Sequence, residues 1–498
     1  MAQHKAALRE HATPTGEHGT HVAEKPPSSD PKWWTLAAVC TGVFMLLLDL
    51  TIVNVALPDI QQQMHTPLSG LQWVIDAYAL SLAALLLTTG SLADLYGRKR
   101  IFALGIVVFT VGSAACGFAP NITLLQLSRA FQGIGGAAMF STALALLASA
   151  FHGRDRGIAF GAFGATTGVA VAVGPVLGGV LTSGLSWRWI FFVNIPICVI
   201  AVAITMLRVA ESHDPQAGRP DWFGFVVFSL SLGALVYGLI EAGDAGGWSS
   251  GRVLVCLALA AALMIVFVLA ELKIAHPMFD LGLLRKPTFT GSLFAAVGIS
   301  ASIFSLLTYL ILYVQNVLGY SPVATGVRFL FLSASSFVAA AVAGRLTSHV
   351  PTKLLLGPGF VIIGVGLLLM LGIHADTGWT HLIAGMVVSG LGLGLVNPPL
   401  ASAAVGVVPT ERAGMASGVN ATFRQVGVAT GIATLGSIFA DEVASGVRSG
   451  MSRRASFVHA LDEITLIAAV ISLAAAAFCF VLIRQKDFEV SMGRSTGD

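Results

Sequence analysis

The amino-acid sequence predicts an all-α protein that crosses a lipid bilayer many times. Of its 498 residues, 55% are apolar and only 11% are charged, whereas a soluble globular chain carries about 25% charged residues. The apolar runs are too long for the strands of a membrane barrel, which alternate over about ten residues. The membrane spans are therefore helical, and the small net charge of +3 gives no reason to expect a nucleic-acid partner.

Fourteen apolar runs of bilayer-crossing length follow one another along the chain, each bounded by polar residues or by Pro and Gly. The predicted spans are residues 34–57, 71–93, 100–119, 122–148, 157–181, 189–208, 222–242, 252–271, 289–314, 322–345, 353–374, 379–406, 414–440 and 461–483. The five cysteines stand singly in apolar stretches, so we expect packing residues and no metal site.

An internal repeat indicates two related halves. The string Gly90–Lys99 recurs in degraded form as Gly344–Lys353, with Ser348 in the position of Asp94. Two related halves are typical of secondary transporters, whose substrate site lies between them. We expect a disordered cytoplasmic tail (1–32), an N-terminal six-helix bundle (33–208), an inserted two-helix pair with flanking loops (209–288), a C-terminal six-helix bundle (289–484) and a cytoplasmic tail (485–498).

The distribution of lysine and arginine predicts the orientation. An even number of spans places both termini on one side. With that side cytoplasmic, the inner tails and loops hold 20 of the 28 basic residues and the outer loops hold five. This bias predicts cytoplasmic termini. For the membrane itself we expect a bacterial inner membrane. The predicted outer loop 441–460 is the exception, because it carries three arginines.

Enzyme signatures are missing from the sequence. None of the eight lysines follows a glycine, so the chain has no phosphate-binding loop of the Gly-Lys-Ser/Thr type and no ATP is expected. It also has no His-Glu-x-x-His and no Gly-x-Ser-x-Gly string. We therefore expect a protein that is not an enzyme and that needs no cofactor.

Charged residues within the spans are the candidates for chemistry, because each is costly in a bilayer unless paired or solvated. Asp49, Arg129 and Asp76 all lie roughly 8–12 Å from the outer ends of their spans. Gln132 follows Arg129 on one helix face, and Gln72 precedes Asp76 on another. A carboxylate whose arginine contact changes between conformations takes up a proton in one state and releases it in the other. Asp49 and Arg129 are thus predicted to couple transport to protons, the alternative being a permanent structural ion pair.

Five ordered strings carry a family resemblance: Leu48–Pro58, Gly90–Arg100, Arg129–Gly133, Gly174–Gly179 and Trp187–Pro196. They resemble motifs of the major facilitator superfamily, most closely its fourteen-helix drug:proton antiporter branch, over residues 33 to 484. The resemblance implies a 6 + 2 + 6 helix arrangement. It also implies proton-driven export of amphipathic drugs or antibiotics by alternating access.

The resemblance assigns roles to residues of this chain. Gly90, Asp94, Gly97, Arg98, Lys99 and Arg100 match a loop that acts as a conformational latch, with the glycines allowing tight packing and turning. Gly174, Pro175, Gly178 and Gly179 match the antiporter motif. For recognition of cations or substrate we expect Asp76, Gln72, Gln132 and Arg424. The simpler alternatives are a basic loop that only sets topology and a fifth helix that only packs.

The expected partners are small amphipathic molecules, protons and the lipid bilayer. An alternative cargo is an endogenous metabolite, a siderophore or a lipid. Uptake instead of export is a further alternative. A non-transporting sensor or receptor is a remote one, since neither the tails nor the inner loops are long enough for a signalling domain. No role is assigned to Arg328, and Glu241 is expected to be interfacial.

Overall fold

Helices make up nearly all of the described chain, and no strand occurs in it. The computed structural model describes residues 31–488 apart from 152, 214–219, 245–246, 275–276, 278, 348–349, 375 and 409–412. Thirteen helical segments in this part are long and apolar enough to cross a membrane, and the shorter apolar helix Thr352–Leu368 adds another. Each of the fourteen predicted spans coincides with one of these segments.

The helices fall into two groups separated by an inserted pair. The first helix group comprises α1 (Pro31–Met64), α2 (Leu68–Tyr96), α3 (Arg98–Gly117), α4 (Ile122–Ala150), α5 (Gly153–Gly184), α6 (Trp189–Phe192) and α7 (Asn194–Arg208). The inserted pair is α8 (Trp222–Asp244) and α9 (Gly251–Glu271). The second helix group comprises η1 (Leu281–Arg285), α10 (Pro287–Ile299), η2 (Ser300–Phe304), α11 (Ser305–Leu312), η3 (Tyr313–Val317), α12 (Pro322–Leu346), α13 (Thr352–Leu368), α14 (His381–Val405), α15 (Ala413–Arg448) and α16 (Arg453–Leu482).

Local sequence explains several helix ends. The side chain of Asn121 accepts a hydrogen bond from the backbone N–H of Leu124 at the start of α4, at 2.9 Å. Ser321 and Ser452 cap α12 and α16 in the same way. Such side chains satisfy N–H groups that have no partner within the helix. Pro322 occupies the first turn of α12, where its missing N–H is not needed.

The prediction that residues 441–460 form a loop is wrong, because most of these residues are helical. Helix α15 continues to Arg448 and α16 already begins at Arg453, so only a short turn separates the two helices. Gly450 forms this turn with a φ of 92°, a conformation that favours glycine. The prediction followed the apolar run, whereas a helix continues into polar sequence because its backbone hydrogen bonds are internal.

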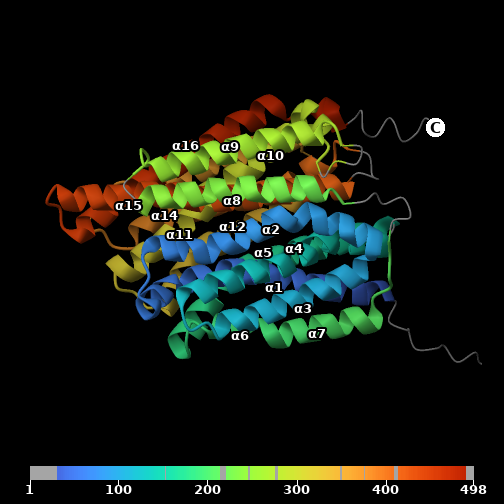
Figure 1. The fold of residues 1–498 in the computed structure, drawn as a ribbon, viewed down its shortest axis with the longest axis horizontal. Helices are drawn as coiled ribbons and strands as arrows, with labels where there is room; N and C mark the ends of the chain where they lie inside the picture. Colours follow the sequence, from blue (N-terminus) through green and yellow to red (C-terminus); the bar gives the residue numbers. More distant parts are fainter. Residues whose placement is uncertain are drawn as a thin grey trace, which may run out of the picture. The chain divides into compact units, whose positions relative to one another are not determined.

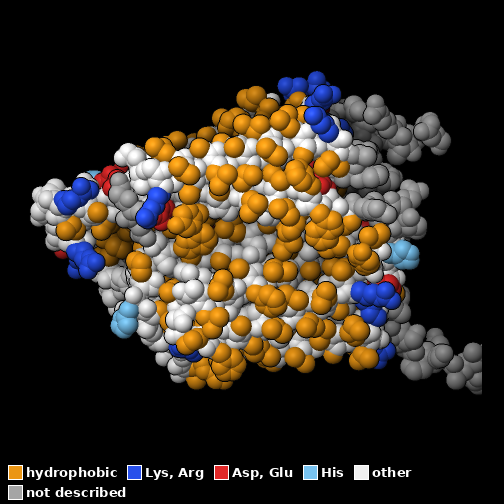
Figure 2. All heavy atoms as spheres, viewed as in Figure 1, with side chains coloured by type: hydrophobic (Ala, Val, Ile, Leu, Met, Phe, Trp, Pro, Cys, Tyr) orange, Lys and Arg blue, Asp and Glu red, His pale blue; other side chains and the backbone are white. Residues whose placement is uncertain are grey.

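The surface is divided as a bilayer requires. In Figure 1, α8, α2 and α4 lie side by side on the face in view. Apolar side chains cover the middle of this face, and Lys and Arg gather toward its two ends (Figure 2). The chain is an integral membrane protein that crosses the bilayer several times.

The inserted pair touches both helix groups. The Ser231 hydroxyl of α8 donates to the carbonyl of Ala260 in α9, at 2.8 Å. On its other side α8 packs against α2 and α15, where Val236 and Ile240 share a buried cluster with Ala79 and Ala433.

Candidate transport site

A buried ion pair joins α1 to α4. Arg129 Nη1 donates to Asp49 Oδ2 at 2.5 Å, and the two side chains are 1% and 0% exposed. Gln132 Nε2 donates to the other carboxylate oxygen at 3.0 Å. The guanidinium carbon also lies 4.2 Å from the centre of the Tyr78 ring. The structure thus brings together the pair that the sequence singled out.

Asn194 completes the set of donors around Asp49. Its Nδ2 lies 3.1 Å from Asp49 Oδ1 and 2.9 Å from the hydroxyl of Ser113, so the network reaches α7 and α3. Three side chains therefore donate to one carboxylate, which stabilises its charged form.

Asp76 lies on the opposite side of α2 from this network. Arg129 Nε contacts the backbone carbonyl of Val74, whereas Gln72, one turn before Asp76, contacts α11 and α15. The Asp76 carboxylate is fully buried, and neither oxygen has a hydrogen-bond partner in the described structure. An ionised carboxylate without donors is costly in such surroundings, so this group requires either a proton or a cation.

The four residues expected to recognise a cation do not form one group. Gln72 and Asp76 share α2, and Gln132 belongs to the Asp49 network. Arg424 lies on α15, where its Nη2 donates to Oδ1 of Asn397 at 2.8 Å.

Hydrogen bonds between the helix groups close one end of the interface. Gln72 Nε2 donates to the carbonyl of Ile432 at 3.1 Å and lies 3.3 Å from the Tyr309 hydroxyl. Thr308 donates to Asn54 Oδ1 at 3.1 Å. These bonds are buried, and they tie α1 and α2 to α11 and α15. We call this set of contacts the seal.

Glycines of the antiporter motif place α5 in close contact with α1 and α12. A methyl group at Gly174 would overlap the side chain of Thr51 in α1, and one at Gly178 would lie 2.9 Å from the carbonyl oxygen of Ile52. A methyl at Gly179 would lie 2.5 Å from the carbonyl oxygen of Pro322 in α12.

Gly326 of α12 packs closely against α5 from the other side of this contact. A methyl at Gly326 would overlap the carbonyl oxygen of Pro175, which is itself part of the motif. Gly179 and Gly326 therefore form a reciprocal contact between the two helix groups. The motif packs α5 on α1 within its own group and on α12 of the other group.

The latch loop is held by its own helix group. Asp94 Oδ1 accepts from Arg98 Nε at 2.8 Å, and Gly97 between them has a φ of 111°. Glu211, which follows α7, accepts from the backbone N–H of Lys99 at 2.9 Å and lies 3.6 Å from Arg100. The side chains of Arg98, Lys99 and Arg100 each have a partner in this structure, that of Lys99 being the backbone carbonyl of Met206 at 2.9 Å.

Gly90 does not make the tight contact expected of it. A methyl group there would lie 3.8 Å from Ser141, which is an ordinary distance.

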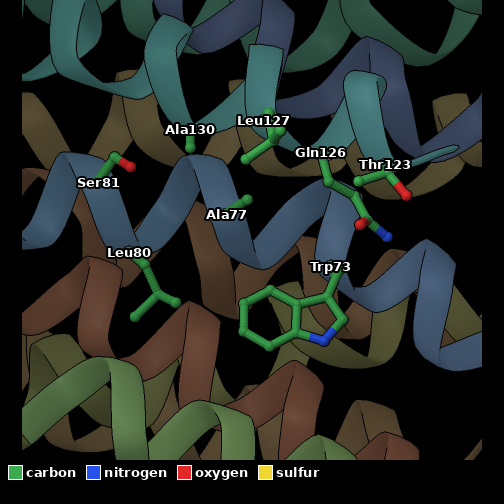
Figure 3. Close-up of a pocket in the computed structure, with 8 residues that line it drawn as sticks. All are labelled: Trp73, Ala77, Leu80, Ser81, Thr123, Gln126, Leu127 and Ala130. Carbon is green, nitrogen blue, oxygen red and sulfur yellow. The ribbon is translucent and has the colours of Figure 1, made fainter. Parts of the chain in front are cut away.

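Two cavities differ in position and size. A cavity of about 20 Å³ lies between the helix groups, lined by residues such as Thr51, Phe304 and Phe329, so apolar side chains nearly fill this space. A larger cavity of about 380 Å³ lies between α2 and α4, where Trp73, Leu80 and Gln126 are among its lining residues (Figure 3). Leu127, at its edge, is 62% exposed, so this cavity opens toward the lipid side.

Two other charged residues have local partners. The Arg328 guanidinium packs over the rings of Tyr320 and Trp379, at 3.7 and 4.7 Å. Glu241 pairs with Arg252 at 3.6 Å and so joins α8 to α9.

Residues 39–432 match the Major Facilitator Superfamily. The chain belongs to this superfamily. It is 37% identical over 408 residues to the multidrug resistance protein Stp of Mycobacterium tuberculosis, a match that covers 82% of this chain and 75% of the relative. It is 34% identical over 465 residues to the puromycin resistance protein pur8 of Streptomyces alboniger, covering 91% and 92%.

Two further comparisons agree with this membership. The tetracenomycin C resistance and export protein of Streptomyces glaucescens is 34% identical over 442 residues, covering 87% of this chain and 81% of the relative. A crystal structure of a bacterial homologue of the human lysosomal transporter Spinster superposes with a TM-score of 0.62 at 16% identity, covering 93% and 99%. The fold is therefore that of a major facilitator transporter.

Three residues of this major facilitator protein were missed by the sequence analysis as partners in the site. Asn194 appeared there only as part of a motif, and Glu211 and Gly326 carried no signal at all. Each contacts a residue more than 100 positions away in the sequence.

Proposed function

We propose that the protein is a proton-coupled exporter of small amphipathic drugs or antibiotics that works by alternating access. Both termini are cytoplasmic in this proposal, and the membrane is a bacterial inner membrane. The observation that carries it is the pair of buried acids, one held by three donors and one held by none. The names of the relatives, which include resistance and export proteins, support the direction and the class of cargo.

Asp49 is the proton-coupling acid in this mechanism. In this proposal the ion pair between Asp49 and Arg129 forms in one conformation and separates in the other. Because Arg129 also contacts α2 through the Val74 carbonyl, separating the pair changes the contacts of three helices. Proton uptake is in this way linked to a helix rearrangement.

Asp76 is the acid that recognises cations. The positive group of a substrate satisfies this carboxylate. Opening of the seal next to Gln72 and Tyr309 exposes the site to the substrate. Release of the substrate is coupled to proton uptake at Asp49, and this exchange across the membrane is antiport.

The experiment is drug or dye flux in everted membrane vesicles with an imposed pH gradient. Asp49→Asn is expected to abolish gradient-driven transport of every substrate. Asp76→Asn is expected to depress transport of cationic substrates by about fivefold or more relative to that of neutral ones, since a charge pair in the opened site is worth on the order of 1–4 kcal/mol. Glu241→Gln is the matched control, because Glu241 pairs with the exposed Arg252 and with no other charged residue of the described chain.

Two outcomes would contradict these assignments. Asp49→Asn that still pumps against a gradient removes Asp49 from proton coupling. Equal losses of cationic and neutral transport in Asp76→Asn make Asp76 a second proton carrier. If the unmodified protein transports its substrates against their gradient without a proton gradient, the proposal of proton coupling is refuted.

A further inference from the structure

The helices α15 and α16 bring a histidine and two carboxylates together at their joined ends. The three residues are Glu442 on α15 and His459 and Glu463 on α16, and their ligand atoms all lie within 4.8 Å of one another. His459 Nδ1 is 4.0 Å from Glu442 Oε2. The two helices extend together at the left of Figure 1, where α15 is labelled.

Packing on both sides fixes the register of these residues. Toward the turn, Gly446 of α15 approaches so closely that a methyl group there would lie 2.6 Å from the Ser456 hydroxyl of α16. On the other side, the rings of Phe439 and Phe457 meet edge to face at 4.8 Å. His459 and Glu463 are four residues apart and so share one face of α16. The ligands are therefore presented by two helices packed against each other, and precise sites are built on such elements.

No basic side chain neutralises these carboxylates. In the described part of the chain neither Glu442 nor Glu463 forms an ion pair with lysine or arginine, and Arg448 lies 4.0 Å from Asp441 instead. Asp462, the neighbour of Glu463, is engaged elsewhere, because its carboxylate accepts the backbone N–H groups of Gly372 and Ile373. The three side chains are thus free to turn toward a shared ion.

We propose that Glu442, His459 and Glu463 bind Zn²⁺. Imidazole nitrogen and carboxylate oxygen are ligands that zinc accepts, and three protein ligands leave a fourth position for water. Ligand atoms around a tetrahedral zinc ion are roughly 3.3 Å apart, given zinc–ligand distances of about 2.0–2.1 Å. His459 is 60% exposed and Glu442 34%, so rotation of the side chains closes the remaining distance without movement of the helices.

The test is zinc affinity of the full-length protein, purified without a histidine tag and measured by competition with a chromophoric chelator. His4, His11, His18 and His21 are replaced by Gln in every sample, so that the amino-terminal histidines do not contribute. His459→Gln and Glu463→Gln are each expected to weaken binding at least tenfold. His374→Gln is the matched control and keeps the parent affinity, since that histidine contacts the carbonyl of Gly372.

A gain-of-affinity variant keeps the proposal testable if a substitution impairs folding. Glu442→His replaces a carboxylate by imidazole, which suits zinc better, and is expected to tighten binding. Zinc should also raise the midpoint of thermal unfolding of the parent but not of the His459→Gln/Glu463→Gln double variant, because a ligand that binds only the folded state stabilises it. Equal zinc affinity in the parent and the double variant would overturn the proposal, as would unchanged affinity in Glu442→His.

Discussion

Substitution of Gly326 by alanine is expected to weaken the close contact between α5 and α12. The added methyl group would overlap the carbonyl oxygen of Pro175 and lie 3.1 Å from Val176 Cα, and both are backbone atoms that cannot rotate away. Overpacking of this kind costs about 1–3 kcal/mol. If that cost applies to the closed state alone, the equilibrium shifts toward the open state by roughly 5- to 150-fold.

Gly344→Ala on the same helix is the matched control. A methyl group at Gly344 meets no atom within 4 Å. Both substitutions raise helix propensity by up to about 1 kcal/mol, so a comparison of the two variants removes that contribution. Only Gly326→Ala adds an atom to the contact between the helix groups.

The assay is the distance between spin labels placed on either side of the α5–α12 contact. Val180 and Val327 are 50% and 49% exposed, so labels at these positions do not disturb the packing. On a background without native cysteines, Gly326→Ala should add a population with longer distances. A distance distribution identical to that of Gly344→Ala would refute the reasoning that this glycine contact holds α5 against α12.

Three further outcomes are expected. Asp94→Asn should insert normally yet transport poorly, because the amide loses its charge-assisted bonds to Arg98, worth about 1–3 kcal/mol; unchanged flux contradicts the latch. Gln72→Leu removes buried hydrogen bonds of the seal, which destabilises the closed state by about 1 kcal/mol and should therefore lengthen the same spin-label distances. An unaltered distance distribution argues against a role of Gln72 in holding the helix groups together. A cysteine at the exposed Ser449 should react with an impermeant thiol reagent from outside intact cells, and reaction from the cytoplasmic side alone would reverse the proposed orientation.

The membrane spans were predictable from sequence because the bilayer imposes one simple requirement, a long apolar run. The same rule failed at residues 441–460, where α15 and α16 continue as polar helices. It also placed the end of one span at residue 374, whereas α13 ends at Leu368 and a turn follows with Gly372 at a φ of 79°. Hydropathy reports where a chain meets lipid and does not report where a helix stops.

The ion pair was predictable because charged residues in apolar spans are rare and costly unless they are paired or solvated. Asp49 and Arg129 stood out for this reason. Asn194 and Gly326 did not, since a neutral amide and a glycine are common in such helices and their partners lie far away in the sequence. The residues proposed to bind zinc were hidden in the same way, because Glu442 and His459 meet only through the pairing of two helices.

Because of the inserted helices, the two lines along which the helix groups meet differ in what covers them. On one side, α8 packs against both α2 and α15, so it covers the line along which these two helices meet. On the other side, α5 meets α12 through Gly179 and Gly326, and Val180 and Val327 beside that contact are exposed. A crevice that opened between the helix groups on the α5–α12 side would therefore face lipid directly, whereas one on the α2–α15 side would face α8.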